Sequence, residues 1–301
     1  MRLAAVTVVL VASVLLAACS GSRSRPGSPG TVHRGAPGTT SPPGGSGIRD
    51  DLSRPQSSRY RDDNDSVPPP FDVSKLPEPV PKAEPRSRYG NKSPYTVRGK
   101  TYRVLPTARG YDERGIASFY GNKFHGYKTS NLETYDMYAF TAASTTLPLP
   151  SYARVTNLDN GKSVIVRVND RGPFHDNRLI DLSFAAAVKI GIWPKGTGLV
   201  EVRGIDPAHP AQELPAPAAV SGGHPGIYLQ VGAFADLSNA DRLARRLRAA
   251  DLGAVQVIDS VVRGQRLRRV RVGPLGSVER ADEVSRRIER MGLPQPQVAV
   301  D

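Results

Sequence analysis

The sequence predicts a mainly β domain followed by a smaller α+β domain. The first observation is a series of short β-rich runs, separated by turn residues, between Gly115 and residue 206. The second is a change after residue 223, where strand-like and helix-like stretches follow in the order β-α-β-β-α-β. The third is a Pro- and Gly-rich N-terminal part with too few large apolar residues to form a core. We therefore expect two folded domains at the end of an extended segment.

The N-terminus indicates export and a lipid anchor. A basic start, Met1-Arg2, precedes an apolar run from Leu3 to Leu16 that is too short to span a membrane, which is typical of a secretory signal peptide over residues 1–18. Cys19 is the only cysteine and ends a segment that resembles the lipobox of bacterial lipoproteins. We expect its thiol to be acylated, the alternative being an incidental cysteine. Without a second cysteine no internal disulfide forms, so the fold depends on its core.

The residue after Cys19 indicates which membrane holds the anchor. Ser20 stands where an Asp would resemble an inner-membrane retention signal. The sequence therefore predicts the periplasmic face of the outer membrane in a Gram-negative cell, and the cell membrane otherwise.

Residues 19–95 are predicted to be a disordered tether. Of the 27 prolines, 14 lie between Ser20 and Gly99, and such segments favour extended, semi-rigid chain. The chain has 41 Lys and Arg against 28 Asp and Glu, a formal net charge of +13. Such an excess of positive charge would usually suggest that the protein binds nucleic acid. An exported protein meets none, so the expected partners are anionic wall polymer and, through the anchor, the membrane.

The barrel domain is predicted over residues 96–206. A hairpin with Arg98-Gly99 in its turn leads into it, and Ser183 is the expected N-cap of a short helix, Phe184–Ile190. Many short strands with one helix suit a small closed barrel, which leaves no exposed edge. The expected strands are Ile116–Tyr120, Phe140–Ala142, Ala153–Thr156, Ser163–Val168, Leu179–Leu182 and Leu199–Val202.

Two carboxyl groups lie near the ends of neighbouring strands in this domain. Asp170 follows the strand Ser163–Val168 in a turn-forming cluster, and Asp181 lies in the next strand-like run. Paired acids in a cleft suit proton transfer on a polar polymer. The alternative is that Asp170 and Arg171 form a surface ion pair or cap a turn.

An ordered set of motifs runs through roughly the central third of the chain. The motifs are Gly115-Ile-Ala-Ser-Phe-Tyr-Gly121, Phe124-His-Gly126, Thr141-Ala-Ala, Leu147-Pro-Leu-Pro, Arg154-Val-Thr-Asn-Leu158, Val168-Asn-Asp-Arg-Gly-Pro-Phe174 and Ile180-Asp-Leu-Ser183. Together they resemble rare lipoprotein A, a bacterial family of septal-ring lytic transglycosylases with a double-psi β-barrel.

The resemblance implies a six-stranded double-psi barrel that cleaves the bond between N-acetylmuramic acid and N-acetylglucosamine in glycan strands lacking stem peptides. It implies formation of a 1,6-anhydro end without addition of water. This chemistry needs a protonated carboxyl as donor and then a base. The catalytic candidates are the three carboxylates that match family motifs: Asp170, Asp181 and Glu133, the last in Thr129-Ser-Asn-Leu-Glu-Thr-Tyr-Asp136. Glu133 could instead be a turn residue, and Asp181 could support the helix start. The sequence predicts no cofactor and no metal site, since zinc-ligand spacings and phosphate loops are missing from it.

Two positions depart from the family pattern. Leu132 stands where the family has Gly, and Ser144 stands where it has His. Serine cannot hold a proton near neutral pH, so it cannot replace imidazole as an acid or base. Two hypotheses follow: a lytic transglycosylase, or a non-catalytic septal peptidoglycan-binding lipoprotein with Ser144 as the discriminating residue.

The C-terminal domain is predicted over residues 224–301, after a Pro- and Ala-rich linker at 207–223. The motifs Leu229-Gln-Val-Gly-Ala-Phe234 and Arg269-Val-Arg-Val-Gly-Pro274 resemble the SPOR domain, which has an RNP-like sheet over two helices. An RNA-binding module would need aromatic side chains on its central strands, and Arg269–Val272 has none, so no nucleic acid is expected. The predicted elements are strands Ile227–Gly232, Ala254–Ser260, Arg266–Val272 and Gln297–Val300, and helices Ser238–Ala250 and Ser277–Met291.

The SPOR resemblance implies binding of naked glycan strands and enrichment at the division septum, with divisome proteins as further candidate partners. Gln230 and Arg271 are the candidate glycan-binding residues, because they are polar positions in the two motif strands. Gln230 could equally be an exposed strand residue without a role.

Overall fold

The computed structural model describes residues 50–54, 66, 71–208, 225–262 and 264–300. The predicted signal peptide, Cys19, most of the tether and nearly all of the linker lie outside these residues. Among the described residues, no helix has the length and apolar character needed to cross a membrane.

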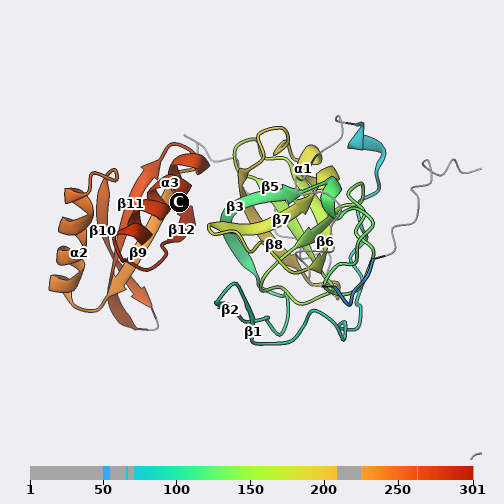
Figure 1. Ribbon diagram of the computed structural model, residues 1–301, viewed down its shortest axis with the longest axis horizontal. Coiled ribbons are helices and arrows are strands. Elements are labelled where there is room, and N and C mark those ends of the chain that lie inside the picture. Colours follow the sequence, from blue (N-terminus) through green and yellow to red (C-terminus); the bar gives the residue numbers. More distant parts are fainter. Residues whose placement is uncertain (1–49, 55–65, 67–70, 209–224, 263, 301) are drawn as a thin grey trace, which may run out of the picture. The chain divides into compact units, whose positions relative to one another are not determined.

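Six strands form a closed barrel (Figure 1). Their order around it is β3-β7-β4-β6-β5-β8. The pairs β3–β7 and β4–β6 are parallel and the other pairs are antiparallel. The predicted closed six-stranded barrel is therefore confirmed. The strands are β3 (Asp112–Tyr120), β4 (Thr141–Ala143), β5 (Ser151–Asn157), β6 (Ser163–Asp170), β7 (Arg178–Ser183) and β8 (Gly198–Ile205).

Strand β6 shows how the sequence fills the barrel. Its side chains alternate between the two faces of the sheet, as a strand requires. Val164, Val166 and Val168 are buried in the barrel core, whereas Ile165 and Arg167 face outward and are only partly buried. The β-branched residues that favour a strand thus also supply its core.

Helix α1 (Phe184–Lys189) follows β7 directly. The Ser183 side chain accepts a hydrogen bond from the Ala186 N–H, which satisfies one of the free donors at the helix start. The predicted N-cap is confirmed. Residues Phe184–Ala187 are buried, so the helix belongs to the core of the barrel domain.

A hairpin precedes the barrel. Strands β1 (Tyr95–Val97) and β2 (Lys100–Tyr102) pair antiparallel around Arg98-Gly99. Both turn residues have positive φ, 50° and 78°, as the tight turns that match strand twist require. The predicted hairpin is confirmed.

The last part of the predicted tether lies against the barrel. We call residues 71–94 the strap. It begins with Phe71, whose ring lies 5.9 Å from that of Phe184, and with the 3-10 turn η2 (Val73–Lys75). Further along, the Ser87 N–H donates to the Leu149 carbonyl at 2.9 Å. The strap has little regular structure, but barrel residues satisfy its polar groups.

The C-terminal domain has one four-stranded antiparallel sheet, in the order β10-β11-β9-β12. Two helices pack on one face of it, because alternate sheet residues and the apolar helix faces share one core. The predicted β-α-β-β-α-β order is confirmed. The elements are β9 (Ile227–Phe234), α2 (Leu237–Ala249), β10 (Val255–Val262), β11 (Gln265–Leu275), α3 (Val278–Arg290) and β12 (Gln297–Val300).

Candidate active site

Asp170 is placed by an irregularity at the end of β6. Ala142 pairs with Val168, but Ala143 pairs with Asp170, so Asn169 is an extra residue in β6. Such a bulge breaks the strict alternation of side chains and redirects them. As a result Asn169 is buried, and Asp170 lines a cleft on the barrel.

The Asp170 carboxylate is held by three donors. Its Oδ1 accepts from the Ser130 N–H at 2.7 Å, the Ser130 hydroxyl at 2.6 Å and the Arg171 N–H at 2.7 Å. Burial raises the pKa of Asp170, and these hydrogen bonds oppose the rise. The donors fix the orientation of a carboxyl group that burial makes easier to protonate.

Arg171 makes no surface ion pair with Asp170. Its guanidinium donates to the carbonyl oxygens of Gly90, Ser144 and Leu147 at 2.6 to 2.8 Å. The Arg171 side chain therefore ties the strap to the loop after β4. The surface-pair alternative is wrong for this residue.

Asp181 lies beside Asp170 in the same cleft. It is on β7, where it pairs with Ser118 of β3 and Ala143 of β4, and it accepts a hydrogen bond from the Ser118 hydroxyl. Burial raises its pKa, opposed by Ser118, His175 and Arg178, and the charge of Asp170 adds to the rise. The two carboxyl groups are thus within electrostatic reach of each other.

Gly172 brings the loop after β6 over Asp181. A Cβ placed on Gly172 would lie 3.8 Å from Asp181 Oδ2 and 3.7 Å from the Ala143 Cβ. Its φ of 146° is one that side-chain-bearing residues rarely adopt. A glycine here allows the backbone to pass close to the carboxylate.

Glu133 is joined to this site through its neighbours but does not line the cleft. The turn from Thr129 to Glu133 also carries Ser130, the donor to Asp170. Glu133 Oε2 accepts from Asn169 Nδ2 at 2.9 Å and from Arg167, and Oε1 accepts from Asn131 Nδ2 at 2.8 Å. Glu133 is more than a turn residue, because its carboxylate contacts the residue next to Asp170.

The pKa of Glu133 is shifted in the opposite direction from the pKa values of the two aspartates. Partial burial would raise its pKa, but the hydrogen bonds from Arg167 and Asn169 outweigh that, so its pKa is lowered. The site therefore combines one carboxylate that stays ionised with two carboxyl groups that burial makes easier to protonate. Environments that separate carboxyl pKa values in this way are typical of acid–base sites.

Ser144 adjoins this site but has a structural role. Its N–H donates to the Asp170 carbonyl at 3.1 Å, and its side chain is buried, with 2% of the residue surface exposed. The hydroxyl oxygen accepts from the Thr146 and Leu147 N–H groups at 3.2 and 3.1 Å. The hydroxyl is therefore engaged in the turn that follows β4.

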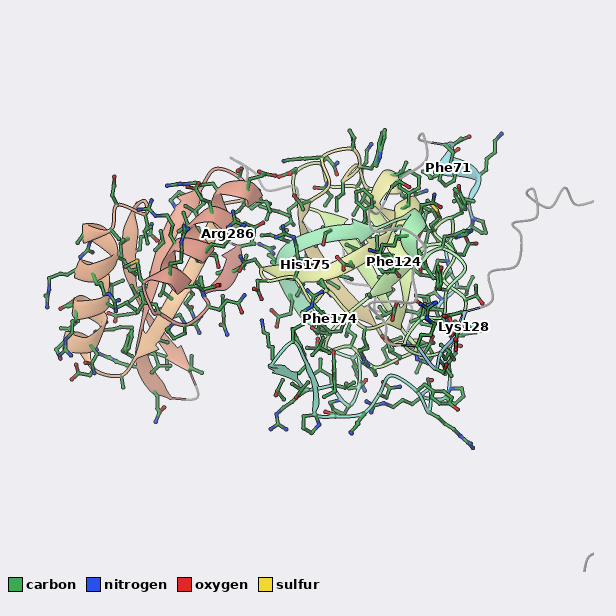
Figure 2. All side chains as sticks on the ribbon, viewed as in Figure 1. Phe71, Phe124, Lys128, Phe174, His175 and Arg286 are labelled. Atoms are coloured by element: carbon green, nitrogen blue, oxygen red, sulfur yellow. The ribbon has the colours of Figure 1, made fainter. Side chains whose placement is uncertain are left out.

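Of the two histidines in the barrel, His175 lines the cleft (Figure 2). It follows Phe174 in the loop after β6 and is exposed. His125 lies elsewhere, where its Nδ1 accepts from the Met137 N–H at 3.2 Å. His175 is thus the imidazole near Asp170 and Asp181, which the sequence alone did not indicate.

Sequence reasoning also missed Arg167, Asn169 and Ser118. One feature of the sequence could have indicated Arg167, because it is the only charged residue in the valine-rich run Ser163–Val168. Asn169 was recognised only as part of a turn-forming cluster. Nothing in the sequence indicated a role for Ser118, because that role depends on the pairing of β3 with β7.

In the C-terminal domain, Gln230 and Arg271 are directly paired across β9 and β11. Gln256 pairs with Arg271 on one side, and Gln297 pairs with Gln230 on the other. Their neighbours along the strands pack toward the helices, so these four residues lie on the opposite face of the sheet. We call Gln256, Arg271, Gln230 and Gln297 the polar row.

These features define a class: a double-psi β-barrel protein with a C-terminal SPOR domain. A family model described as "Lytic transglycolase" matches residues 112–203, and the SPOR domain model matches residues 223–298.

Similarity to curated relatives gives the family. The chain is 46% identical over 282 residues to "Endolytic peptidoglycan transglycosylase RlpA" of Pseudomonas aeruginosa PAO1, over 74% of this chain and 81% of the relative. It is 52% identical over 158 residues to the Vibrio cholerae protein of that name, over 52% and 60% of the two chains. The crystal structure of the P. aeruginosa RlpA SPOR domain is 36% identical, with a TM-score of 0.24, and covers 25% of this chain and 97% of that one. The chain belongs to the RlpA family, as its motifs predicted.

Proposed function

We propose that the protein is a lytic transglycosylase that cleaves peptidoglycan glycan strands lacking stem peptides between N-acetylmuramic acid and N-acetylglucosamine. The observation that carries this proposal is the cleft in which Asp170 and Asp181 lie together, beside the ionised Glu133. Membership of the RlpA family supports the reaction class.

The two aspartates share the proton-transfer role. Neighbouring carboxyl groups do not readily ionise together, so the pair keeps a proton to higher pH than a single exposed aspartate does. That proton goes to the glycosidic oxygen as the bond to the muramic acid C1 breaks. The carboxylate so formed then takes the proton of the C6 hydroxyl, whose oxygen bonds to C1 and closes the 1,6-anhydro ring. Glu133, held ionised by Arg167, acts through Asn169: it accepts from the Asn169 side chain and so positions the residue next to Asp170.

The test is digestion of peptide-free glycan strands by the soluble chain lacking residues 1–19, with mass analysis of the new ends. We expect 1,6-anhydro ends, and we expect Glu133→Gln, Asp170→Asn and Asp181→Asn each to lower the rate while preserving shape. Full activity in all three variants would sink this mechanism.

The second candidate is a non-catalytic septal peptidoglycan-binding lipoprotein. One observation favours it: the Ser144 hydroxyl is used in a turn and offers no proton transfer to the cleft. In that case the digestion gives no new ends, although the protein still retains the strands.

We propose further that the polar row binds the glycan and that Cys19 anchors the protein to the cell envelope, with enrichment at the septum. Amide and guanidinium groups gathered on one face of a sheet suit the hydroxyl and acetamido groups of a polysaccharide. Substituting Arg271 by Ala should weaken retention of the full chain on peptide-free strands. Arg268→Ala is the control, because it removes the same charge from the same strand but from the face that Val270 and Val272 share. Equal loss in both variants would count against the polar row.

A further inference from the structure

We propose that the strap is an integral part of the active site and that Glu84 is a positioning residue. Its carboxylate binds two of the Arg167 guanidinium nitrogens and leaves the third to Glu133. The inference deepens the proposed function and rests on it only for the effect on catalysis. It also moves the start of the catalytic unit from residue 96 to about Phe71.

Arg167 connects the strap to the candidate site. Its Nε and Nη2 donate to the two carboxylate oxygens of Glu84 at 3.0 and 2.9 Å, and its Nη1 donates to Glu133 Oε2. The Arg167 and Glu84 side chains are 19% and 20% exposed. A two-point arginine–carboxylate pair that is largely shielded from water is stronger and better oriented than an exposed pair.

The geometry arises from the alternation along β6. Ile165 and Arg167 are two residues apart, so both face out of the barrel. The strap passes over this face: Glu78 Oε2 accepts from the Ile165 N–H at 3.1 Å, and Glu84 meets Arg167. The strap therefore follows β6 toward the bulge that places Asp170.

Contacts on both sides of Glu84 fix the strap. Before it, the Phe71 ring packs on Phe184 and on Tyr138. After it, Asn91 Oδ1 accepts from the Leu149 N–H at 2.9 Å and Nδ2 donates to the Leu149 carbonyl at 2.6 Å. Glu84 itself also accepts from the Tyr152 hydroxyl. Glu84 is thus held in place independently of Arg167.

Few charged groups determine the state of Glu133. Arg167 of β6 is the cation that contacts it, Asn131 and Asn169 supply neutral donors, and Glu84 is the second anion on Arg167. Lys82 of the strap lies near Glu84. Glu84 accepts from two guanidinium nitrogens of Arg167 and Glu133 accepts from one. Removing the negative charge of Glu84 therefore leaves Glu133 as the only anion bound to Arg167 and strengthens the attraction between the two.

The test is a titration of the Glu133 side-chain carboxyl carbon by NMR in the full chain without residues 1–19. In Glu84→Gln the pKa of Glu133 should fall by about one pH unit, the effect of removing one charge a few ångströms away. Glu78→Gln is the matched control, because it removes the same charge from the same strap but from a residue bonded to a main-chain N–H. Glu84→Asp, which keeps the charge, should restore the wild-type value.

An unchanged Glu133 pKa in Glu84→Gln, or an equal fall in Glu78→Gln, would overturn the proposal. If Glu84→Gln does not fold, backbone hydrogen exchange in the wild type tests whether the strap is docked on the barrel. The Leu149 and Ile165 N–H groups must exchange slowly if the strap stays docked, and free exchange of both overturns the proposal.

The titration does not depend on catalysis. A shifted Glu133 pKa in a chain that forms no anhydro ends would refute the proposed function and leave the strap inference intact. In an active chain, the acid limb of the pH–rate profile should move to lower pH in Glu84→Gln and stay in place in Glu78→Gln.

Discussion

At the scale of single residues, the site depends on carboxyl groups in unlike surroundings. Asp170 and Asp181 are partly buried in the cleft and their pKa values are raised, whereas Glu133 has the guanidinium of Arg167 against it and its pKa is lowered. The sequence predicted all three acids, because each stands in a recognisable motif. It could not predict that the pKa values of the two aspartates are raised and that of Glu133 is lowered, because these shifts come from burial and from partners distant in sequence.

Ser144 leads to a prediction at this scale. An imidazole in its place would lie beside the Asp170 main chain and supply an acid–base group, which typically contributes about 10²–10⁴-fold. We expect Ser144→His to raise the rate of anhydro-end formation toward the lower end of that range. We also expect it to lower the melting temperature, because the Thr146 and Leu147 N–H groups lose their acceptor.

The control for this prediction is Ser144→Ala, which loses the same acceptor without gaining an imidazole. A histidine variant no faster than the alanine variant would show that the position does not reach the chemistry.

At the scale of elements, the barrel strands and both helices of the C-terminal domain followed from local pattern. Valine-rich runs predicted strands such as β6, and Ser183 predicted the start of α1. The bulge at Asn169 and the docking of the strap did not follow from local pattern. A Pro-rich segment without a core of its own resembles a tether, and only its pairing with outward-facing residues of β6 shows otherwise.

The strap also predicts how stability changes with pH. The pKa of Glu84 in the folded protein is below its ordinary value of 4.5, chiefly because of the Arg167 hydrogen bonds. A lowered pKa stabilises the fold above the unfolded value and loses that effect as the pH falls through the folded value. We expect Glu84→Gln to be less stable than the wild type by about 1–2 kcal/mol at pH 7.

That difference should shrink as the pH falls below 4.5, because Glu84 of the wild type becomes protonated as the pH passes through its lowered pKa. Denaturant unfolding over a series of pH values from 7 downward measures it. A constant difference across this range would mean that the charge of Glu84 contributes nothing.

At the scale of the whole molecule, one chain combines a barrel of the lytic transglycosylase family with a SPOR domain. Family membership confirms that combination. The lipid anchor stays a prediction from Cys19 and the residues before it. We expect Cys19→Ala to release the protein from the membrane fraction, with Ser20→Ala as the control. Unchanged fractionation of Cys19→Ala would argue against acylation.

The most direct test of the central claim is digestion of peptide-free glycan strands in ¹⁸O-labelled water. Attack by the sugar's own C6 hydroxyl requires no water. We therefore predict new 1,6-anhydro ends that contain no ¹⁸O, formed more slowly by Asp170→Asn and Asp181→Asn. New reducing ends that carry ¹⁸O, or a complete absence of new ends, would contradict the assignment of a lytic transglycosylase.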